Sequence, residues 1–174
     1  MLEVFACEGC AVILRHVRGK LQPLANGETS PCGNSKMTLC EKQDALAADL
    51  SRFKNPQDRL AHMIRLGRAA AGLDEKFKTP EAKLEGCLSN LWLRSEFRDG
   101  LCFFRADSDS AIVKGLATVI CDLFSALPPE EILKADLAPL RQAGLWQQLT
   151  PNRRTGLSRL VDNIHEFARE HLPK

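Results

Sequence analysis

The chain lacks any apolar stretch long enough to cross a lipid bilayer. A membrane-spanning helix needs roughly 20 consecutive apolar residues, whereas the longest apolar run near the N-terminus extends only from Ala11 to Leu14 and ends at Arg15. The stretch from Met1 to Cys7 contains an early acid and lacks the basic segment that begins a secretory signal. We therefore expect a cytoplasmic protein with no membrane partner.

A strong excess of one charge is also missing. The 174 residues include 24 Lys and Arg against 22 Asp and Glu, which gives a formal net charge of +2, and the two signs are interspersed. A nucleic-acid-binding protein normally carries a basic patch or stripe. The composition therefore predicts no nucleic-acid partner.

The familiar catalytic signatures are absent as well. No glycine-rich phosphate-binding loop is present, and no catalytic triad or carboxylate pair can be assembled from the sequence. The four histidines, His16, His62, His165 and His171, are scattered and are interpreted as surface or packing residues. Seven cysteines remain, and in a reducing compartment a cysteine is more often free, metal-bound or catalytic than paired in a disulfide.

The N-terminal cysteines do not complete a metal site. Cys7 and Cys10 form a C-x-x-C pair, but Cys32 and Cys40 follow singly, so the second pair of a zinc ribbon is missing. We therefore predict that these cysteines hold no metal.

Among the remaining cysteines, Cys87 is the candidate nucleophile. It follows Gly86 and precedes an alternating strand pattern, which predicts a reachable thiol at a loop-to-strand junction. Cys102 and Cys121 lie within an apolar strand and an apolar helix, where a cysteine behaves as a small hydrophobic residue.

The sequence divides near Met37. Residues 1–36 lack periodicity and are rich in turn-forming residues, so we expect an irregular N-terminal extension, either disordered or the product of a mis-assigned start, with translation beginning at Met37. The segment from Thr38 to Glu41 fits a capping box at the start of a helix. Residues 37–174 are therefore predicted to form a single domain.

Within that domain, the apolar spacing predicts helices, then a hairpin, then more helices. The expected hairpin runs from Leu88 to Ala106 around an Asp99-Gly100 turn, and residues before Cys87 supply a third strand. Helices are expected at 38–50, 55–71, 108–126, 130–134, around Leu140 and at 151–168. The resulting fold class is α+β, a small antiparallel sheet of about three strands with helices packed on one face.

Three sequence blocks resemble the SufE family. Residues 86–92 match its G-C-x-S-x-x-W segment around the sulfur-accepting cysteine, residues 107–116 match D-S-D-x-x-I-V-x-G-L, and residues 149–157 match L-[ST]-P-x-R-x-x-G-L. The resemblance extends from about Met37 to about Ala168. It implies a SufE/IscU-like fold.

The resemblance also implies a function in iron–sulfur cluster assembly. Cys87 would accept a persulfide sulfur from a pyridoxal-phosphate-dependent cysteine desulfurase, SufS-like or CsdA-like, and stimulate that enzyme. It would then pass the sulfur to a SufB-like iron–sulfur scaffold. Such a chain is a sulfur carrier and activator, not an enzyme with a cofactor of its own, and thiolate attack on a persulfide requires one reachable thiol.

The same resemblance names the other site residues. Gly86 and Ser89 would form the sulfur-acceptor loop. Asp107, Ser108, Asp109 and Arg153 would be loop or partner contacts. For the two acids and the serine, the residue types favour a plainer role, since Asp107 or Ser108 can cap the following helix.

Two other functions are consistent with the general fold. An IscU-type iron–sulfur scaffold would require several thiolates, and Cys102 and Cys121 would have to leave apolar surroundings to join Cys87. A binding module with an idle thiol is the other alternative, and the intact G-C-x-S-x-x-W segment argues against it.

Overall fold

The computed structural model describes residues 6–7, 10–11, 37–85, 89–135 and 137–173. The chain forms two compact units, Met1–Ser35 and Lys36–Lys174. In the first unit, β1 (Ala6–Cys7) pairs with β2 (Cys10–Ala11) in antiparallel register, so the segment expected to be irregular contains a minimal hairpin. All other described residues belong to the second unit.

The first two helices of the second unit begin where their capping residues predict. At the start of α1 (Leu39–Ser51), the Glu41 N–H donates to Thr38 Oγ1 and the Thr38 N–H donates to the Glu41 carboxylate at 2.7 Å, which completes the predicted capping box. At the start of α2 (Pro56–Ala69), Asn55 is the N-cap and its side chain accepts the Asp58 N–H. Both helix starts are therefore set by local sequence.

A β-hairpin follows, as the sequence predicts. β3 (Leu91–Arg98) and β4 (Leu101–Ser108) pair antiparallel through their whole length. Asp99 and Gly100 form the turn with φ values of 53° and 75°, the positive values that a two-residue turn of this kind requires.

Among the described residues, the sheet of β3 and β4 has no complete third strand. The expected count of about three strands is therefore wrong. Lys83 makes one isolated antiparallel bridge with Trp92, and the Leu84 N–H donates to the Leu91 carbonyl at 2.7 Å. The residues before Cys87 thus contact the outer edge of β3 at its first residues only. Pro80 and the charged residues around it carry none of the alternating apolar pattern that extends a strand.

The start of the central helix differs from the sequence prediction. The N-cap of α3 (Ala111–Phe124) is Ser110, whose Oγ accepts the Val113 N–H. Asp107 and Ser108 were expected to cap this helix, but both are still in β4, because that strand runs two residues past its predicted end at Ala106. The capping prediction for these residues is therefore wrong.

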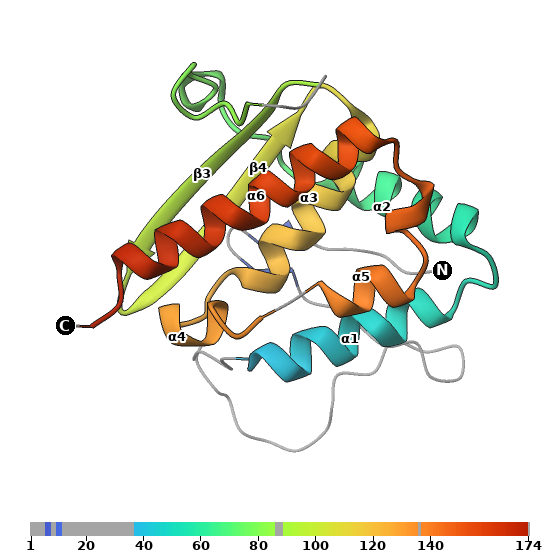
Figure 1. Cartoon of the computed structure of the whole chain (residues 1–174), viewed down its shortest axis with the longest axis horizontal. Coiled ribbons are helices and arrows are strands. Elements are labelled where there is room, and N and C mark those ends of the chain that lie inside the picture. The colour runs from blue at the N-terminus through green and yellow to red at the C-terminus, as the bar shows by residue number, and fades with distance from the viewer. Residues whose placement is uncertain (1–5, 8–9, 12–36, 86–88, 136, 174) are drawn as a thin grey trace. The chain divides into compact units, whose positions relative to one another are not determined.

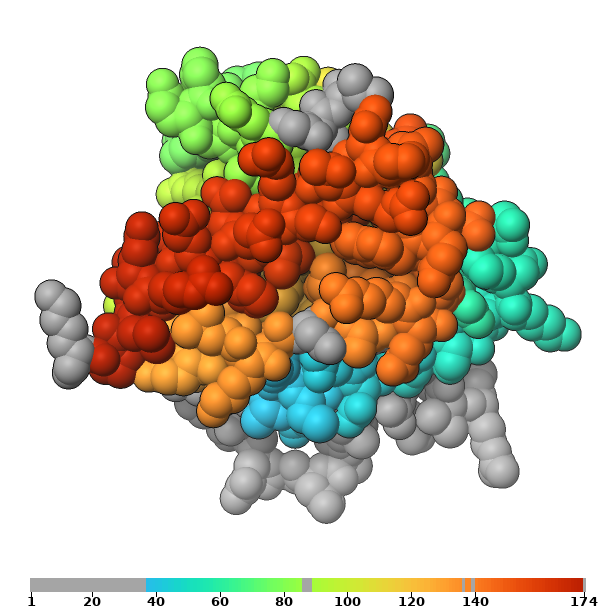
Figure 2. All heavy atoms as spheres, viewed as in Figure 1, coloured from blue at the N-terminus to red at the C-terminus, as the bar shows by residue number. Residues whose placement is uncertain are grey.

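The remaining helices complete an α+β fold, which confirms the predicted class. They are α4 (Pro129–Ile132), α5 (Ala138–Gln142), α6 (Pro151–Glu170) and the short 3-10 turns η1 (Glu75–Phe77) and η2 (Trp146–Gln148). Figure 1 shows α3 and α6 running along the hairpin, with α1, α2 and α5 farther from the strands. In the space-filling view, α6 and the segment that leads into it form a continuous surface over the core (Figure 2). None of the helices in the described residues has the length and apolar character to span a bilayer.

The core centres on α3. Val113, Ile120 and Phe124 are fully buried, and β4 contributes Phe104 from the hairpin. The helices α2 and α3 approach each other at two glycines. A Cβ on Gly115 would lie 2.2 Å from the Met63 carbonyl oxygen, so only glycine permits this contact.

Leu91, Leu93 and Phe97 alternate with polar residues, which predicts one buried face along β3, but burial decreases toward the turn. Leu91 is fully buried and Leu93 half-buried, whereas Phe97 is 40% exposed. Phe97 instead stacks on His171 just beyond the end of α6, with ring centroids 4.6 Å apart. The exposed end of β3 thus meets α6 only at His171, the residue that follows the helix.

Candidate thiol site and its supporting contacts

Hydrogen bonds between described residues hold the chain on both sides of the segment that contains the candidate thiol. Gly86 and Cys87 themselves lie outside the described residues, and so does Leu88. Leu84 is buried and its N–H donates to the Leu91 carbonyl, so the two ends of the connection are held together. Cys87 is three residues after Leu84 and four residues before Leu91.

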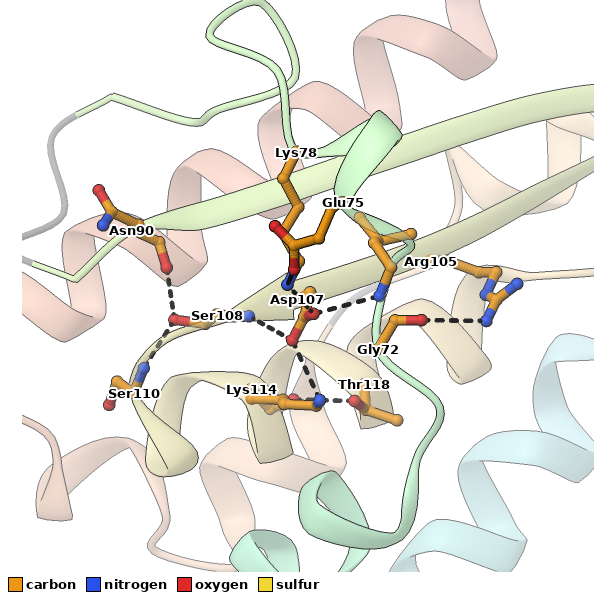
Figure 3. Close-up of polar contacts among 11 residues, drawn as sticks. Gly72, Glu75, Lys78, Asn90, Arg105, Asp107, Ser108, Ser110, Lys114 and Thr118 are labelled. Atoms are coloured by element: carbon orange, nitrogen blue, oxygen red, sulfur yellow. Dashed lines mark hydrogen bonds and ion pairs between the residues drawn. The ribbon is translucent and has the colours of Figure 1, made fainter.

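Asn90 is the point at which this connection is fixed to β4 and the turn that follows. Ser108 Oγ donates to the Asn90 carbonyl oxygen at 2.6 Å, and Asn90 Nδ2 donates to Asp109 Oδ2 at 2.8 Å. Ser108 Oγ also accepts the Ser110 N–H at 3.2 Å (Figure 3). Ser108 and Asp109 thus contact a residue three positions after Cys87. The half-buried Ser89 side chain makes no hydrogen bond to a described residue.

Asp107 is the centre of a buried ionic cluster, which we define as Asp107, Lys78, Lys114 and the backbone N–H of Leu73. Asp107 is 5% exposed and accepts the Leu73 N–H at 3.1 Å. Lys78 Nζ lies 3.2 Å from Oδ2 and Lys114 Nζ lies 3.1 Å from Oδ1 (Figure 3). The cluster joins the segment after α2, the end of β4 and the first turn of α3.

Gly72 makes room for this cluster. A Cβ at position 72 would lie 2.5 Å from Asp107 Oδ2 and 3.1 Å from Lys114 Nζ. The Gly72 carbonyl also accepts a hydrogen bond from Arg105 Nη2 at 3.4 Å. A larger residue at this position would push the chain away from the buried carboxylate.

The cluster shifts the pKa values of Asp107 and Lys78. Burial by itself raises the pKa of Asp107, but hydrogen bonds from Lys114, Lys78 and the Ser108 N–H outweigh it and hold the pKa below the usual carboxyl value. Hydrogen bonds from Lys78 to Glu75 and then to Asp107 raise the pKa of Lys78. Both lysines form ion pairs with the Asp107 carboxylate, which makes them structural cations of this site.

The first turn of α6 lies at the same end of the hairpin as Asn90. Phe97, near the hairpin turn, stacks on His171 just after the C-terminus of α6. A helix of this length spans roughly 30 Å and β3 spans roughly 26 Å, so the helix and the strand cover about the same distance. Half-buried Arg153 in the first turn of α6 is therefore on the Asn90 side, as Figure 1 shows for the N-terminus of the helix.

The two buried cysteines that the structure describes are confirmed as core residues. Cys102 is 0% exposed and Cys121 is 2% exposed. Burial raises the pKa of Cys102 to about 11, and burial together with Asp122 raises the pKa of Cys121 as well. At neutral pH both are thiols rather than thiolates, so neither is a nucleophile or a ready metal ligand. By contrast, Cys40 on α1 is exposed.

No group of three or more metal-ligating side chains occurs in the part of the chain that the structure describes. A cavity of about 420 Å³ lies at the opposite end of the hairpin, next to the Asp99-Gly100 turn, and is lined by Met37, Leu101 and Leu127 among others. It is separated from Asn90 by the length of β3. This cavity is therefore not a substrate pocket for the thiol segment.

Sequence reasoning missed the supporting residues Lys78, Lys114 and Asn90. In the sequence, Lys114 interrupts an apolar helical pattern, and Lys78 lies in a charged stretch that contains Pro80. One signal was available, since an isolated lysine in the first turn of a buried helix needs a nearby acid. Lys78 and Lys114 lie 29 and 7 positions from Asp107. Asn90 lies 18 and 19 positions from Ser108 and Asp109, so none of these pairings has a signature in adjacent residues.

Comparison with known proteins agrees with this architecture. Residues 44–168 match the family model described as "SufE: Fe-S metabolism associated domain". A solution structure of a hypothetical protein from Thermus thermophilus is similar with a TM-score of 0.62 and 17% sequence identity, over 78% of this chain and 98% of that chain. At this level of identity the structural likeness concerns the fold.

Proposed function

Since this chain belongs to the SufE family, which is associated with iron–sulfur metabolism, we propose that Cys87 accepts sulfur from a cysteine desulfurase. The observation that carries the proposal is the G-C-x-S-x-x-W segment at residues 86–92. It is supported by the contacts that hold Asn90, which fix the chain three residues after Cys87 to Ser108 and Asp109.

The proposed transfer is a thiol exchange at a persulfide. The Cys87 thiolate attacks the outer sulfur of the desulfurase persulfide, and a new S–S bond forms on Cys87. The S–S bond to the enzyme breaks, and the electron pair leaves with the desulfurase cysteine as a thiolate. Cys87 then carries a persulfide, and the proton of the transferred sulfur stays with that sulfur or exchanges with solvent.

The desulfurase partner is proposed to be a pyridoxal-phosphate enzyme of the SufS or CsdA type, which the chain would stimulate by removing its sulfur. The downstream acceptor would be a SufB-like iron–sulfur scaffold. We propose that residues 37–174 carry this function in the cytoplasm and that residues 1–36 are an extension outside it. The chain itself would act as carrier and activator.

The supporting contacts suggest how the remaining site residues act. Asp109 and Ser108 hold Asn90, and the ion pairs of Asp107 fix the end of β4 beside them. Arg153 has no ion pair with a described carboxylate and lies on the same end of the hairpin. We assign to Arg153 a contact with the partner or with the thiol segment, and to the acids the positioning of that segment.

The alternatives are less well supported. A scaffold needs several thiolates, and the buried thiols of Cys102 and Cys121 would have to be exposed and ionised before they could bind metal. An inactive binding module would have no need of an intact Gly86-Cys87-x-Ser89 segment.

The test is a sulfur-loading assay on the full chain. The chain is mixed with a SufS-type desulfurase and cysteine, and peptide mass spectrometry locates the added sulfur. We expect the mass of one sulfur atom on the Cys87 peptide and an increase in desulfurase turnover, both lost in Cys87→Ser. Cys40→Ser is the matched control, because Cys40 is an exposed thiol on α1, and it should behave as the parent chain. Sulfur found on Cys40 instead, or full stimulation by Cys87→Ser, would reject the proposal.

A further inference from the structure

The outer edge of β3 is open over the second half of the strand. In an antiparallel ladder, successive residues direct their backbone groups alternately to the two sides. The Leu93 N–H donates to the Ala82 carbonyl at 2.9 Å, so odd-numbered residues of β3 face outward. Ser95 and Phe97 continue this series, and their outward N–H and C=O groups have no partner among the described residues. Figure 1 shows β3 as the outermost strand there.

Arg94 and Arg98 border this open edge on one face of the hairpin, and Arg105 of β4 lies on the same face. Arg94 stacks over the Phe77 ring at 3.6 Å, and Arg98 stacks over the Phe103 ring at 4.2 Å. Arg105 pairs across the ladder with Arg94, an arrangement of like charges that is unfavourable by itself. Within the described part of the chain, none of the three guanidinium groups has a carboxylate within 4.0 Å.

The acidic residues near this edge form no ion pairs with the three arginines. Glu96 lies on the same face of β3 between Arg94 and Arg98, and Asp99 follows in the turn, but both are exposed and neither forms an ion pair with an arginine. A guanidinium stacked on an aromatic ring is held in place with its edge directed outward. The face therefore offers preorganised donors to an anionic side chain.

The opposite face of the same edge is apolar. Phe97 is 40% exposed and stacks on His171, and Leu172, the next residue, is 38% exposed. An extended chain added beside Ser95 and Phe97 would direct alternate side chains to the two faces. One set would meet Arg94 and Arg98, and the other set would meet Phe97.

We propose that the edge of β3 from Arg94 to Arg98 is a docking site for an extended segment of a partner protein in which acidic and apolar residues alternate. The backbone of the partner pairs with Ser95 and Phe97, and its acids pair with the arginines. Two copies of this chain are disfavoured as occupants, because antiparallel pairing of β3 with itself about Glu96 brings Arg94 against Arg98 of the second copy. The centre of the site lies roughly 20 Å from Asn90 along the strand, and the site uses neither Cys87 nor its supporting contacts.

The first test measures binding of a fluorescein-labelled peptide that alternates glutamate and valine, by fluorescence anisotropy with the full chain at low salt. We expect binding that slows deuterium exchange of the Ser95 and Phe97 amides. Replacing each glutamate of the peptide by lysine should abolish it, as should Arg94→Glu. Binding of the lysine peptide with equal affinity, or no protection of the two amides, would overturn the proposal.

The second test removes the main-chain hydrogen bonds alone. Ser95→Pro deletes one outward N–H without touching the ladder with β4, and it should weaken peptide binding about tenfold relative to Ser95→Ala. Should Ser95→Pro fail to fold, a peptide N-methylated on alternate residues gives the same comparison with the unaltered chain. Equal affinity for the methylated and unmethylated peptides would refute strand addition. A dimer that Ser95→Pro dissociates would assign the edge to a second copy and also refute it.

Discussion

Gly115→Ala tests whether the contact between α2 and α3 is as close as the structure has it. A Cβ at this position would lie 2.2 Å from the Met63 carbonyl oxygen and 2.7 Å from its carbonyl carbon. Both are backbone atoms of α2, so no side-chain rotation relieves the contact. To reach the 3.0 Å below which such contacts are essentially never seen, the helices must separate by roughly 0.8 Å.

The expected magnitude follows from two opposing effects. Overpacking a core costs about 1 to 3 kcal/mol, and the upper value applies here because backbone must move. Alanine is favoured over glycine in a helix interior by about 1 kcal/mol. The net expectation is a loss of about 2 kcal/mol in the free energy of unfolding, or about 4 to 8 °C in Tm for a chain of this size.

The assay is urea and thermal unfolding followed by circular dichroism. Gly67→Ala should cause a similar loss, because a Cβ at that position would lie 2.4 Å from Gly115 Cα. The double variant should lose less than the sum, since one separation of the helices relieves both contacts. Thr118→Ala, at a half-buried position of α3, is the control for substitution on this helix. A gain in stability for Gly115→Ala would show that helix propensity dominates and would refute the close contact.

Two further predictions concern pH. The Lys114 and Lys78 bonds lower the pKa of Asp107 despite its burial, so the stability it contributes is present above the usual carboxyl pKa of 3.8 and is lost as pH falls through the lower folded value. Asp107→Asn should be less stable at neutral pH and should lose this acid-range dependence in urea unfolding; pH profiles that stay parallel to those of the parent would contradict it. Burial, and to a smaller extent the nearby positive charge of Arg169, lowers the pKa of His165 below 6.5. The buried Nε2 atom of His165 has no hydrogen-bond partner among the described residues. Its stabilising effect is therefore present above pH 6.5 and is lost as pH falls through the folded value, so His165→Leu should flatten the stability profile between about pH 7 and about pH 5. An unchanged slope in that range would exclude His165 as its source.

The sequence predicted best where structure depends on neighbouring residues. The capping box from Thr38 to Glu41 and the Asn55-Pro56 helix start are local hydrogen-bonding patterns. The Asp99-Gly100 turn depends on the backbone freedom of two adjacent residues. Each of these was confirmed because its energy comes from contacts within a few positions.

Predictions failed where distant residues decide the outcome. Asp107 has the residue type of a helix cap, yet it pairs with two lysines from other elements and remains in β4. The buried face expected along β3 ends before Phe97, which stacks on His171 just after α6 and stays 40% exposed, and no pattern within the strand records where that helix ends.

The sequence by itself determined the α+β class, the helix starts, the hairpin turn and the family, and it identified Cys87 as the candidate thiol through a short motif of adjacent residues. Only the tertiary structure decided that Asn90 is held by Ser108 and Asp109 and that, among the described residues, an unpaired edge with unmatched arginines remains on β3. The physical reason is that burial and charge pairing depend on which distant surfaces meet, whereas caps, turns and motifs are complete within a few residues of one chain segment.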